Sequence, residues 1–464
     1  MPRHGFTLLP HPARGSTTVI RRPSIVGLFA AAALTAAVVS PALGAGDGHG
    51  PGSSPAPGER NARWVSTWTS MPQLTEPGNM PPAPFTQAGS VLTDATLRQT
   101  VHVSAGGEHI RLRFSNAFGG AVLPITKASV ALPLDGRAGT SAVEAGTTRP
   151  LTFQGRSSVS VPVGAQVVSD PLGFTLAPGS DLTATVYLAT GQASTSITSH
   201  PGSRTTSYLR AGDHVTDADL PGATPTDHWY FLSGVEVWSR STTSAAVVLG
   251  DSLTDGRGST TNMNDRWPDL LHERLRAGAA TSKTAVVNQA AGGNRLLNDG
   301  LGPNGLARLD RDVLAQSGVD WLFVFEGVND IGTAEATPAA QKQVAADVIA
   351  AYEQIITRAH TQGIRVYGAT LTPIGGNTGY DDPDGHREQA RQTVNTWIRT
   401  SGRFDGVVDF DRAVRDPKAP RRLRAELDTG DHLHLNPAGY RAMADAVPTR
   451  LFRQAPLPRG FGFD

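Results

Sequence analysis

Apolar and polar residues alternate with a period of two in the first half of the chain. In residues 110–115 and 182–188 every second side chain is apolar. This period predicts strands with one buried face. Further short apolar runs begin at Ser158 and Trp229, and turns rich in Gly, Pro, Asp and Ser separate them. The succession, without helical periods between its members, predicts an all-β sandwich or jelly-roll domain over residues 62–242.

The pattern changes near residue 243. Short, continuously apolar runs begin at Ala245, Trp321, Ile364 and Gly406, as expected for parallel strands that are covered on both faces. Between two of them, residues 348–359 carry apolar side chains at helical spacing. Alternation of strand and helix predicts a three-layer α/β sandwich over residues 243–456. Its ligand site should lie at the carboxyl ends of the strands.

The N-terminal residues follow neither pattern. The arginines at 14, 21 and 22 precede an apolar run at 25–39 and a small-residue stretch at 41–45. This order predicts a secretory signal peptide over residues 1–45 and an exported protein without a lasting membrane anchor. The pair Arg21 and Arg22 leaves the general and the twin-arginine export routes both open. Residues 46–61, rich in Gly, Pro and Ser, are expected to form a flexible linker.

Charge and composition exclude several classes of function. Lys+Arg and Asp+Glu both number 41, so the formal net charge is +0. A chain without net charge has no overall field that would attract nucleic acid, and we expect no nucleic-acid partner. The absence of cysteine excludes disulfides, Cys-containing zinc sites and thiol nucleophiles. We expect neither a metal nor an organic cofactor.

Polar blocks in the second half carry the candidate chemistry. They are 250–256 (GDSLTDG), 288–294 (NQAAGGN), 327–330 (GVND) and 431–437 (DHLHLNP). The serine of the first block is a weak nucleophile unless a base removes its proton. Glycine N–H groups and an asparagine amide can donate hydrogen bonds to a reacting oxygen. Asp431 and His434 are three residues apart, close enough within a turn to share a hydrogen bond.

In this order and strand context, the blocks resemble the SGNH (GDSL-type) hydrolase family. The letters of the family name fall on Ser252, Gly293, Asn329 and His434, with the acid at Asp431. Gly293 stands five residues after Asn288, the spacing that the family shows, while Gly292 stays an alternative. The resemblance covers the chain from residue 243 on. Residues 294–297 and Glu326 further resemble a branch of aryl- and acyl-esterases with an N-terminal β domain.

The resemblance implies a flavodoxin-like α/β/α catalytic domain and a secreted serine esterase. His434 is then the general base for Ser252, and Asp431 orients the imidazole. The backbone N–H groups of Ser252 and Gly293 and the amide of Asn329 form the oxyanion hole. An ester carried by a small molecule or a polysaccharide is the expected substrate. Its acyl chain and alcohol, the oligomeric state and the role of the β domain stay open.

Several alternatives compete with this interpretation. His432 and His434 could hold a metal, but no HExxH motif or set of carboxylate ligands accompanies them. Asp251, Asp255 and Asp330 could form a glycosidase pair, although loop capping is the simpler expectation. Within the esterase class, a carbohydrate O-deacetylase and a lipase both remain. The non-enzyme alternative is a polysaccharide-binding module that carries an idle hydrolase domain.

Overall fold

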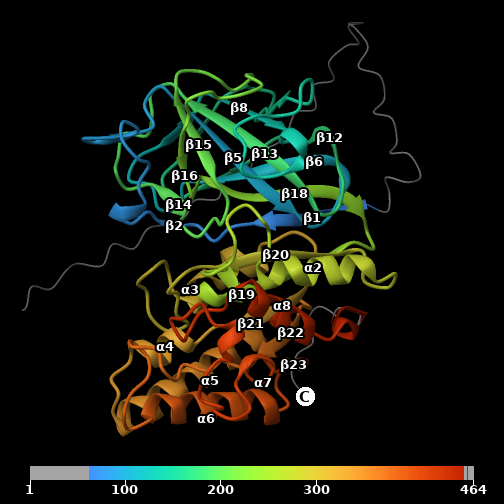
Figure 1. Cartoon of the computed structure of the whole chain (residues 1–464). Helices are drawn as coiled ribbons and strands as arrows, with labels where there is room; N and C mark the ends of the chain where they lie inside the picture. The colour runs from blue at the N-terminus through green and yellow to red at the C-terminus, as the bar shows by residue number, and fades with distance from the viewer. Residues whose placement is uncertain (1–61, 454–456, 458–464) are drawn as a thin grey trace, which may run out of the picture. The chain divides into compact units, whose positions relative to one another are not determined.

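The computed structural model describes residues 62–453 and 457 (Figure 1). The predicted signal peptide and linker, residues 1–61, lie outside the described residues. The part up to residue 240, here called the β region, is built of antiparallel strands. The part from residue 244 to 453, here called the α/β region, alternates strands and helices. Both belong to one compact unit, and the predicted domain boundaries stay a prediction.

Two larger antiparallel sheets make up most of the β region. One has the order β1-β18-β6-β11, with β12 also pairing with β6, and the other has the order β16-β15-β5-β13-β8-β9. A single apolar cluster contains residues of both sheets, such as Leu112 and Val237 from the first and Leu97 and Val186 from the second. These alternating residues face inward because a strand presents every second side chain to the same side.

The strands of these sheets are β1 (Ala62–Thr69), β5 (Ala95–Val103), β6 (Gly107–Ser115), β8 (Lys127–Ala131), β9 (Arg149–Pro150), β11 (Gln166–Val168), β12 (Leu172–Leu176), β13 (Ser180–Leu188), β15 (Ser207–Ala211), β16 (Thr224–Thr226) and β18 (Leu232–Arg240). Smaller sheets pair β2 (Gln73–Leu74), β14 (Thr198–His200) and β17 (Trp229–Tyr230), then β7 (Leu123–Ile125) with β10 (Val159–Val161), and β3 (Thr86–Gln87) with β4 (Ser90–Val91). The helical turns of this region are η2 (Pro77–Asn79) and η3 (Leu134–Gly136).

The α/β region contains a five-stranded sheet of order β20-β19-β21-β22-β23. Every neighbouring pair in it is parallel. Its strands are β19 (Ser244–Gly250), β20 (Thr284–Ala290), β21 (Val319–Phe325), β22 (Arg365–Ala369) and β23 (Gly406–Val408). Strands were predicted at four of these positions. The sequence analysis did not identify β20, whose last three residues fall inside the polar block at 288–294.

Helices cover both faces of this sheet. Along β19, Ala246 and Val248 belong to one apolar cluster, whereas Val247 and Leu249 belong to another. The first cluster includes side chains of α2 and α8, and the second includes side chains of α5 and α6, which lie side by side (Figure 1). The helices are α1 (Ser252–Asp255), α2 (Trp267–Ala277), α3 (Gly305–Leu309), η4 (Asp310–Leu314), α4 (Val328–Thr333), α5 (Pro338–Thr361), α6 (His386–Thr400), α7 (Phe410–Val414), η5 (Ala425–Leu427), α8 (Pro437–Ala446) and η6 (Thr449–Arg453).

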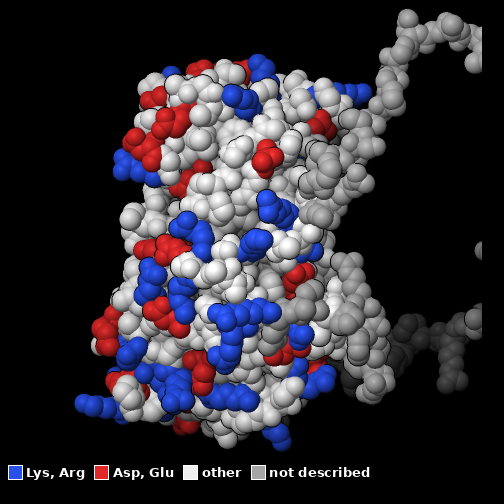
Figure 2. Space-filling model, turned by 90° about the vertical axis from the view of Figure 1, so that its right-hand side faces the viewer, with Lys and Arg blue, Asp and Glu red and all other residues white. Residues whose placement is uncertain are grey.

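Positive and negative side chains are interspersed on the face shown in Figure 2. This agrees with the balanced charge of the whole chain. No helix in the described part is both long and apolar enough to span a membrane.

Candidate active site

Ser252 lies directly after β19, at the first position of α1. The carboxylate of Asp251 caps this short helix by accepting the N–H of Leu253 at 2.9 Å. Gly256 ends the helix with φ 97°, in the left-handed region that glycine adopts without steric cost. The block therefore folds into a tight turn that presents the serine at the carboxyl edge of the parallel sheet.

Three side chains of the first and last blocks form one continuous chain of hydrogen bonds. Ser252 Oγ lies 2.8 Å from His434 Nε2. His434 Nδ1 lies 2.6 Å from Asp431 Oδ2. Asp431 Oδ1 also accepts the backbone N–H groups of His434 at 2.8 Å and Leu433 at 3.0 Å. With a proton on Nδ1 donated to the carboxylate, Nε2 is free to accept the serine hydroxyl proton.

The surroundings of the imidazole favour its neutral form. Burial lowers the pKa of His434, Asp431 acts in the opposite direction, and the charges of Arg257 and Arg204 lower the pKa further. Partial burial alone would raise the pKa of Asp431, but the hydrogen bonds from His434 and Leu433 hold it well below its usual range. The geometry thus pairs an ionised carboxylate with a neutral imidazole that can act as a base.

The second histidine of this block is held elsewhere. His432 Nδ1 lies 2.7 Å from Asp428 Oδ2, so each of the two histidines pairs with its own aspartate. Within the described residues, no group of three or more His, Asp or Glu side chains is arranged to hold a metal ion. Asn436 caps α8 and Pro437 begins it, which fixes where the loop that carries His434 ends.

Donors for a developing oxyanion face the same cavity. Within residues 62–453, the backbone N–H groups of Ser252, Gly292 and Gly293 donate to no acceptor. Gly292 and Gly293 line the cavity together with Ser252 and Asn329. An amide N–H without an internal partner, beside a nucleophile, is available to a reacting carbonyl oxygen.

The two glycines differ in what they tolerate. Gly293 has φ +72°, and a Cβ atom there would come within 2.4 Å of Leu301 Cδ1. Gly292 has no positive φ, and its Cβ would meet only Asp255 Oδ2, at 3.8 Å. The left-handed backbone at Gly293 therefore strains any side chain there, and Leu301 would have to move, whereas Gly292 has room for alanine. This distinction supports Gly293 as the position that requires glycine.

Asn329 is held by contacts on both ends of its amide. Its Nδ2 donates to the carbonyl oxygen of Asn294 at 2.7 Å, and its Oδ1 accepts the hydroxyl of Tyr380 at 2.6 Å. The ring of Tyr380 packs against Gly332 of α4, where a Cβ atom would lie 2.5 Å from the ring. Burial raises the pKa of Tyr380, so the hydroxyl stays a donor. One Asn329 N–H is left for a ligand in the cavity.

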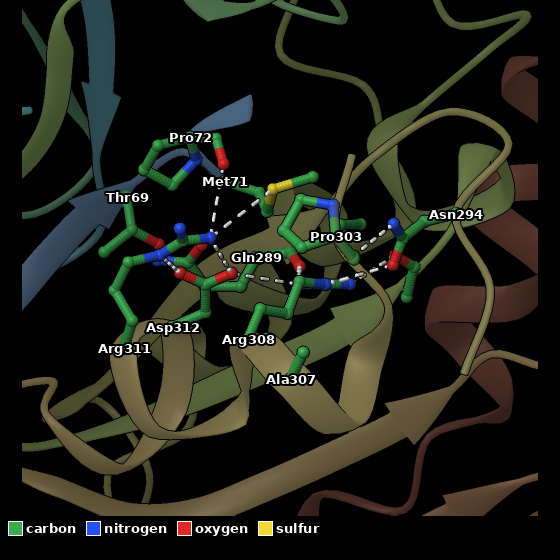
Figure 3. Close-up of polar contacts among 12 residues, drawn as sticks. Thr69, Met71, Pro72, Gln289, Asn294, Pro303, Ala307, Arg308, Arg311 and Asp312 are labelled. Atoms are coloured by element: carbon green, nitrogen blue, oxygen red, sulfur yellow. Dashed lines mark hydrogen bonds and ion pairs between the residues drawn. The ribbon is translucent and has the colours of Figure 1, made fainter. Parts of the chain in front are cut away.

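A buried arginine, Arg308, connects the ends of neighbouring strands, and Figure 3 shows its contacts with Gln289 and Asn294. Arg308 donates from Nε to Asn294 Oδ1 at 3.0 Å and from its terminal nitrogens to the carbonyl oxygens of Gln289 and Gly250. It also pairs with Glu326 at 3.1 Å. Gly250 ends β19, Gln289 lies in β20 and Glu326 follows β21. Arg308 therefore fixes the ends of these three strands, and the polar blocks at them, relative to one another.

Carboxyl groups are unusually buried around this arginine. Burial raises the pKa of Asp251 to about 7 and that of Glu326 to about 8, although Arg308 acts in the opposite direction on both. Asp330 accepts the backbone N–H groups of Leu296 at 2.9 Å and Leu297 at 3.0 Å. Asp251 and Asp330 thus act as capping groups, as predicted.

Within the described residues the Asp255 carboxylate accepts no backbone N–H group, contrary to the expectation of loop capping. Its Oδ1 lies 2.9 Å from Nε2 of His200, at the end of β14 in the β region. His200 Nδ1 lies 3.1 Å from the carbonyl oxygen of Met71. Gly202 approaches so closely that a Cβ atom there would lie 1.8 Å from Asp255 Oδ2. The β region therefore contacts the helix that begins with Ser252.

A second contact between the regions involves Arg311 (Figure 3). Its NH2 group donates to the carbonyl oxygen of Pro72 at 3.2 Å, and its guanidinium pairs with Asp312. Thr69 Oγ1 donates to the carbonyl oxygen of Asn288 at 3.0 Å. These contacts fasten β1 and the segment after it to β20 and η4.

The triad and the oxyanion donors line a cavity of about 880 Å³. Its α/β wall contains Ser252, Gly292, Gly293, Asn329 and His434, and the β region contributes Gln73, Glu76, Asn79, His200 and Arg204. The structure thus brings every residue that the sequence analysis named for the site to one cavity. It adds His200, Arg204, Arg308 and Tyr380, which carry no local motif and become visible only through contacts between distant segments.

Comparison with known proteins identifies the family. Residues 248–442 match the sequence model of the GDSL-like lipase/acylhydrolase family. This match assigns residues 248–442 to the SGNH/GDSL hydrolases, as the sequence resemblance implied. The family supports a hydrolase that acts on esters. No curated protein matches the chain.

The solved structures that match cover less than half of the chain. An acetylxylan esterase from Geobacillus stearothermophilus is 20% identical, with 44% of this chain and 91% of that chain covered and a TM-score of 0.34. A carbohydrate acetylesterase family member from Sinorhizobium meliloti is 18% identical, with 46% and 99% covered and a TM-score of 0.34. The acetyl xylan esterase AlAXEase is 21% identical, with 44% and 96% covered and a TM-score of 0.32.

Proposed function

We propose that the chain is a serine esterase in which Ser252, His434 and Asp431 form a catalytic triad. The observation that carries this proposal is the continuous hydrogen bonding from Ser252 Oγ through the imidazole to the Asp431 carboxylate. In this arrangement the serine is next to its base and the base is oriented by an acid, as a nucleophilic mechanism requires.

The reaction then proceeds through an acyl-enzyme. His434 Nε2 takes the proton of Ser252 Oγ as the oxygen attacks the ester carbonyl carbon, and Asp431 stabilises the imidazolium that forms. The imidazolium returns the proton to the leaving alkoxide, and the acyl group stays on the serine. Water, deprotonated by the same imidazole, attacks the carbonyl carbon of the acyl-enzyme. The bond to Ser252 Oγ then breaks, the imidazolium returns its proton to that oxygen, and the carboxylic acid is released.

The backbone N–H groups of Ser252 and Gly293 and the side-chain amide of Asn329 are suited to hold the oxyanion of each tetrahedral intermediate. Each such donor contributes about 3 kcal/mol of transition-state stabilisation. The hydrogen bonds from Asn329 to Asn294 and from Tyr380 to Asn329 support this role because they fix the amide before substrate binds.

The composition of the cavity favours a carbohydrate O-deacetylase over a lipase. Polar side chains such as Gln73, Asn79 and Asn377 line it, and its aliphatic wall is confined to a few residues that include Leu301 and Leu433. A long acyl chain would need a continuous apolar surface. We therefore expect short acyl groups on a polar alcohol, and no preference for long chains.

The alternative of an idle hydrolase attached to a binding module receives no support from the site. The nucleophile, its base and the acid are within hydrogen-bonding distance of one another. The β region also shares the cavity instead of offering a separate binding surface for glycan.

Two further proposals concern the whole chain. The two apolar clusters on either side of β19 support a three-layer α/β/α arrangement, and the shared core of the antiparallel sheets supports a β sandwich.

The N-terminal sequence supports export and removal of residues up to about 45. The proposed partner is an ester-bearing small molecule or polysaccharide, without nucleic acid. N-terminal sequencing of the exported protein tests the cleavage.

The enzymatic proposal is tested with para-nitrophenyl esters from acetate to palmitate and with acetylated xylan. The mature wild-type protein should hydrolyse the short esters, and Ser252→Ala should lose activity by about four orders of magnitude or more. Ser282→Ala removes an exposed serine that precedes β20 and does not line the cavity; it serves as the matched control and should retain full activity. Equal inertness of wild type and Ser252→Ala on every ester would contradict the proposal.

A further inference from the structure

Two arginines line the cavity without any partner within the described residues. Arg204 comes from the turn that follows β14, and Arg257 follows α1. No hydrogen bond or ion pair involves either guanidinium there. Both charges act on His434, whose pKa they lower, so both lie near the imidazole.

The carboxylates of the cavity, by contrast, are already engaged. Glu76 accepts hydrogen bonds from Gln73 and Asn79. Asp255 is bonded to His200, and Asp431 to His434. The two guanidiniums are therefore the charged groups of the cavity wall that still lack a counterpart.

Arg204 is held in an unusual conformation. Its φ is +52°, a region that residues other than glycine adopt at an energetic cost. Ser203 Oγ donates to the carbonyl oxygen of Thr205 at 2.7 Å, and the Arg204 carbonyl oxygen accepts the N–H of Asn262 at 2.9 Å. The turn is thus pinned to the α/β region, and this pinning fixes the point from which the side chain enters the cavity.

The guanidinium of Arg204 also has a buried donor without an acceptor. Arg204, Arg387 and Arg424 are the arginines of the described part whose Nε is enclosed and unbonded. The terminal nitrogens of Arg387 and Arg424 donate to backbone carbonyl oxygens, whereas those of Arg204 donate to no group of the described residues. A buried donor left without a partner is costly, and such groups call for an acceptor.

We infer that Arg204 and Arg257 form a subsite for a carboxylate on the alcohol part of the ester substrate. Guanidinium groups bind planar oxyanions through paired N–H donors. The leaving alcohol takes its proton from His434, so the arginines near that imidazole face the alcohol and not the acyl chain. A singly charged carboxylate suits a cavity that also contains three carboxylates better than a dianion does.

The inference rests on the proposed esterase activity and names its substrate class: short acyl esters of hydroxy acids, of which O-acylated uronic acids are the carbohydrate form. It gives the β region a definite role, because Arg204 belongs to that region. The β region then selects the alcohol, while the α/β region performs the hydrolysis.

The test compares two esters with the same acetyl group and nearly the same shape. These are para-acetoxybenzoate, which carries a carboxylate on the alcohol part, and para-acetoxybenzamide, which is neutral. The measured quantity is the ratio of kcat/KM for the anionic ester to that for the neutral ester. The ratio should exceed one for wild type and fall with rising salt concentration.

Arg204→Ala should lower this ratio by about 10-fold or more, the usual size of a lost hydrogen bond to a charged group, and Arg257→Ala should lower it in the same direction. Arg204→Lys, which keeps the charge, should recover part of the ratio. Arg156→Ala removes an exposed arginine of the β region outside the cavity, and it should leave the ratio unchanged.

A second pair locates the charge. para-Nitrophenyl hemisuccinate carries a carboxylate on the acyl part, and para-nitrophenyl butyrate is its neutral counterpart. Their ratio should depend less on Arg204 than the first ratio does, and a stronger dependence would overturn the assignment to the alcohol side. An unchanged first ratio in Arg204→Ala would overturn the subsite itself. Turnover of the neutral ester that is lost in Ser252→Ala keeps the esterase proposal standing in both cases, whereas inertness of wild type on all four esters would overturn that proposal too.

Discussion

Removal of the His200 side chain should destabilise the protein far more than removal of a similar histidine at the surface. His200 and Asp255 are 4% and 3% exposed, and their hydrogen bond of 2.9 Å joins the β region to the helix that begins with Ser252. The ring also stacks on Trp229 at a centroid distance of 5.7 Å. His200→Ala therefore leaves a buried carboxylate without its partner and opens a cavity beside an indole.

The size of the effect follows from these contacts. Loss of one partner of a buried charged pair costs about 3–5 kcal/mol, and loss of a neutral hydrogen bond with an unsatisfied acceptor costs about 1–3 kcal/mol. We expect His200→Ala to lower the free energy of unfolding by about 3 kcal/mol. His214 pairs with Asp217 at 2.7 Å, but these side chains are 24% and 48% exposed. His214→Ala, the matched control, should cost about 1 kcal/mol or less.

The assay is urea unfolding followed by tryptophan fluorescence, with the free energy taken from the transition midpoint and slope. A double-mutant cycle separates the pair from the cavity. Asp255→Ala in the His200→Ala background removes the unpaired carboxylate and should recover part of the lost stability, with a coupling of about 2 kcal/mol. If His200→Ala costs no more than His214→Ala, or if the cycle shows no coupling, the reasoning about this contact is refuted.

Three further predictions concern groups in and beneath the site. Burial raises the pKa of Glu326 in the folded state to about 8, so between about pH 5 and 8 the folded protein binds more protons than the unfolded chain. The free energy of unfolding should therefore fall as the pH rises through this range, by up to about 1.4 kcal/mol per pH unit. Glu326→Gln should flatten this dependence in urea unfolding at a series of pH values, and parallel curves for both proteins would contradict the raised pKa. Gly293→Ala should abolish most ester hydrolysis, whereas Gly292→Ala should retain it; equal losses would show that the two glycines are equivalent. Tyr380→Phe should lower kcat about 5- to 10-fold with little change in KM, since it frees the Asn329 amide, and a change confined to KM would instead assign the hydroxyl to ground-state binding.

The apolar runs and periods of the sequence predicted the helices and strands whose own residues carry a clear pattern. The strands that begin near Ala245 and Trp321 were predicted because continuous apolar runs suit a sheet that is covered on both faces. The helix that ends at Thr361 was predicted from helical spacing. The strand at 284–290 was not predicted, because its last residues are polar and make side-chain hydrogen bonds instead of continuing the apolar run. Asn288, for example, donates to the carbonyl oxygen of Thr254 at 2.8 Å.

The residues of the site also fall into two groups, those that local motifs predict and those that only the tertiary fold brings together. Ser252, Asp431 and His434 stand in motifs whose residues are neighbours in sequence, and the family match supports the class of enzyme. His200 lies 55 residues before its partner Asp255, and nothing near either residue indicates that they meet. Arg308 has equally little local signal, because its role comes from the strand ends that converge on it. Long-range contacts of this kind depend on the tertiary fold and not on any local period.

The measurement that tests the central claim most directly is covalent labelling of the nucleophile with a fluorophosphonate, followed by mass spectrometry of the intact protein and its peptides. The account predicts one adduct per chain, on the peptide that contains Ser252, with no labelling of Ser252→Ala and much slower labelling of His434→Ala. An adduct on a different residue, or labelling of Ser252 at the same rate without His434, would contradict it.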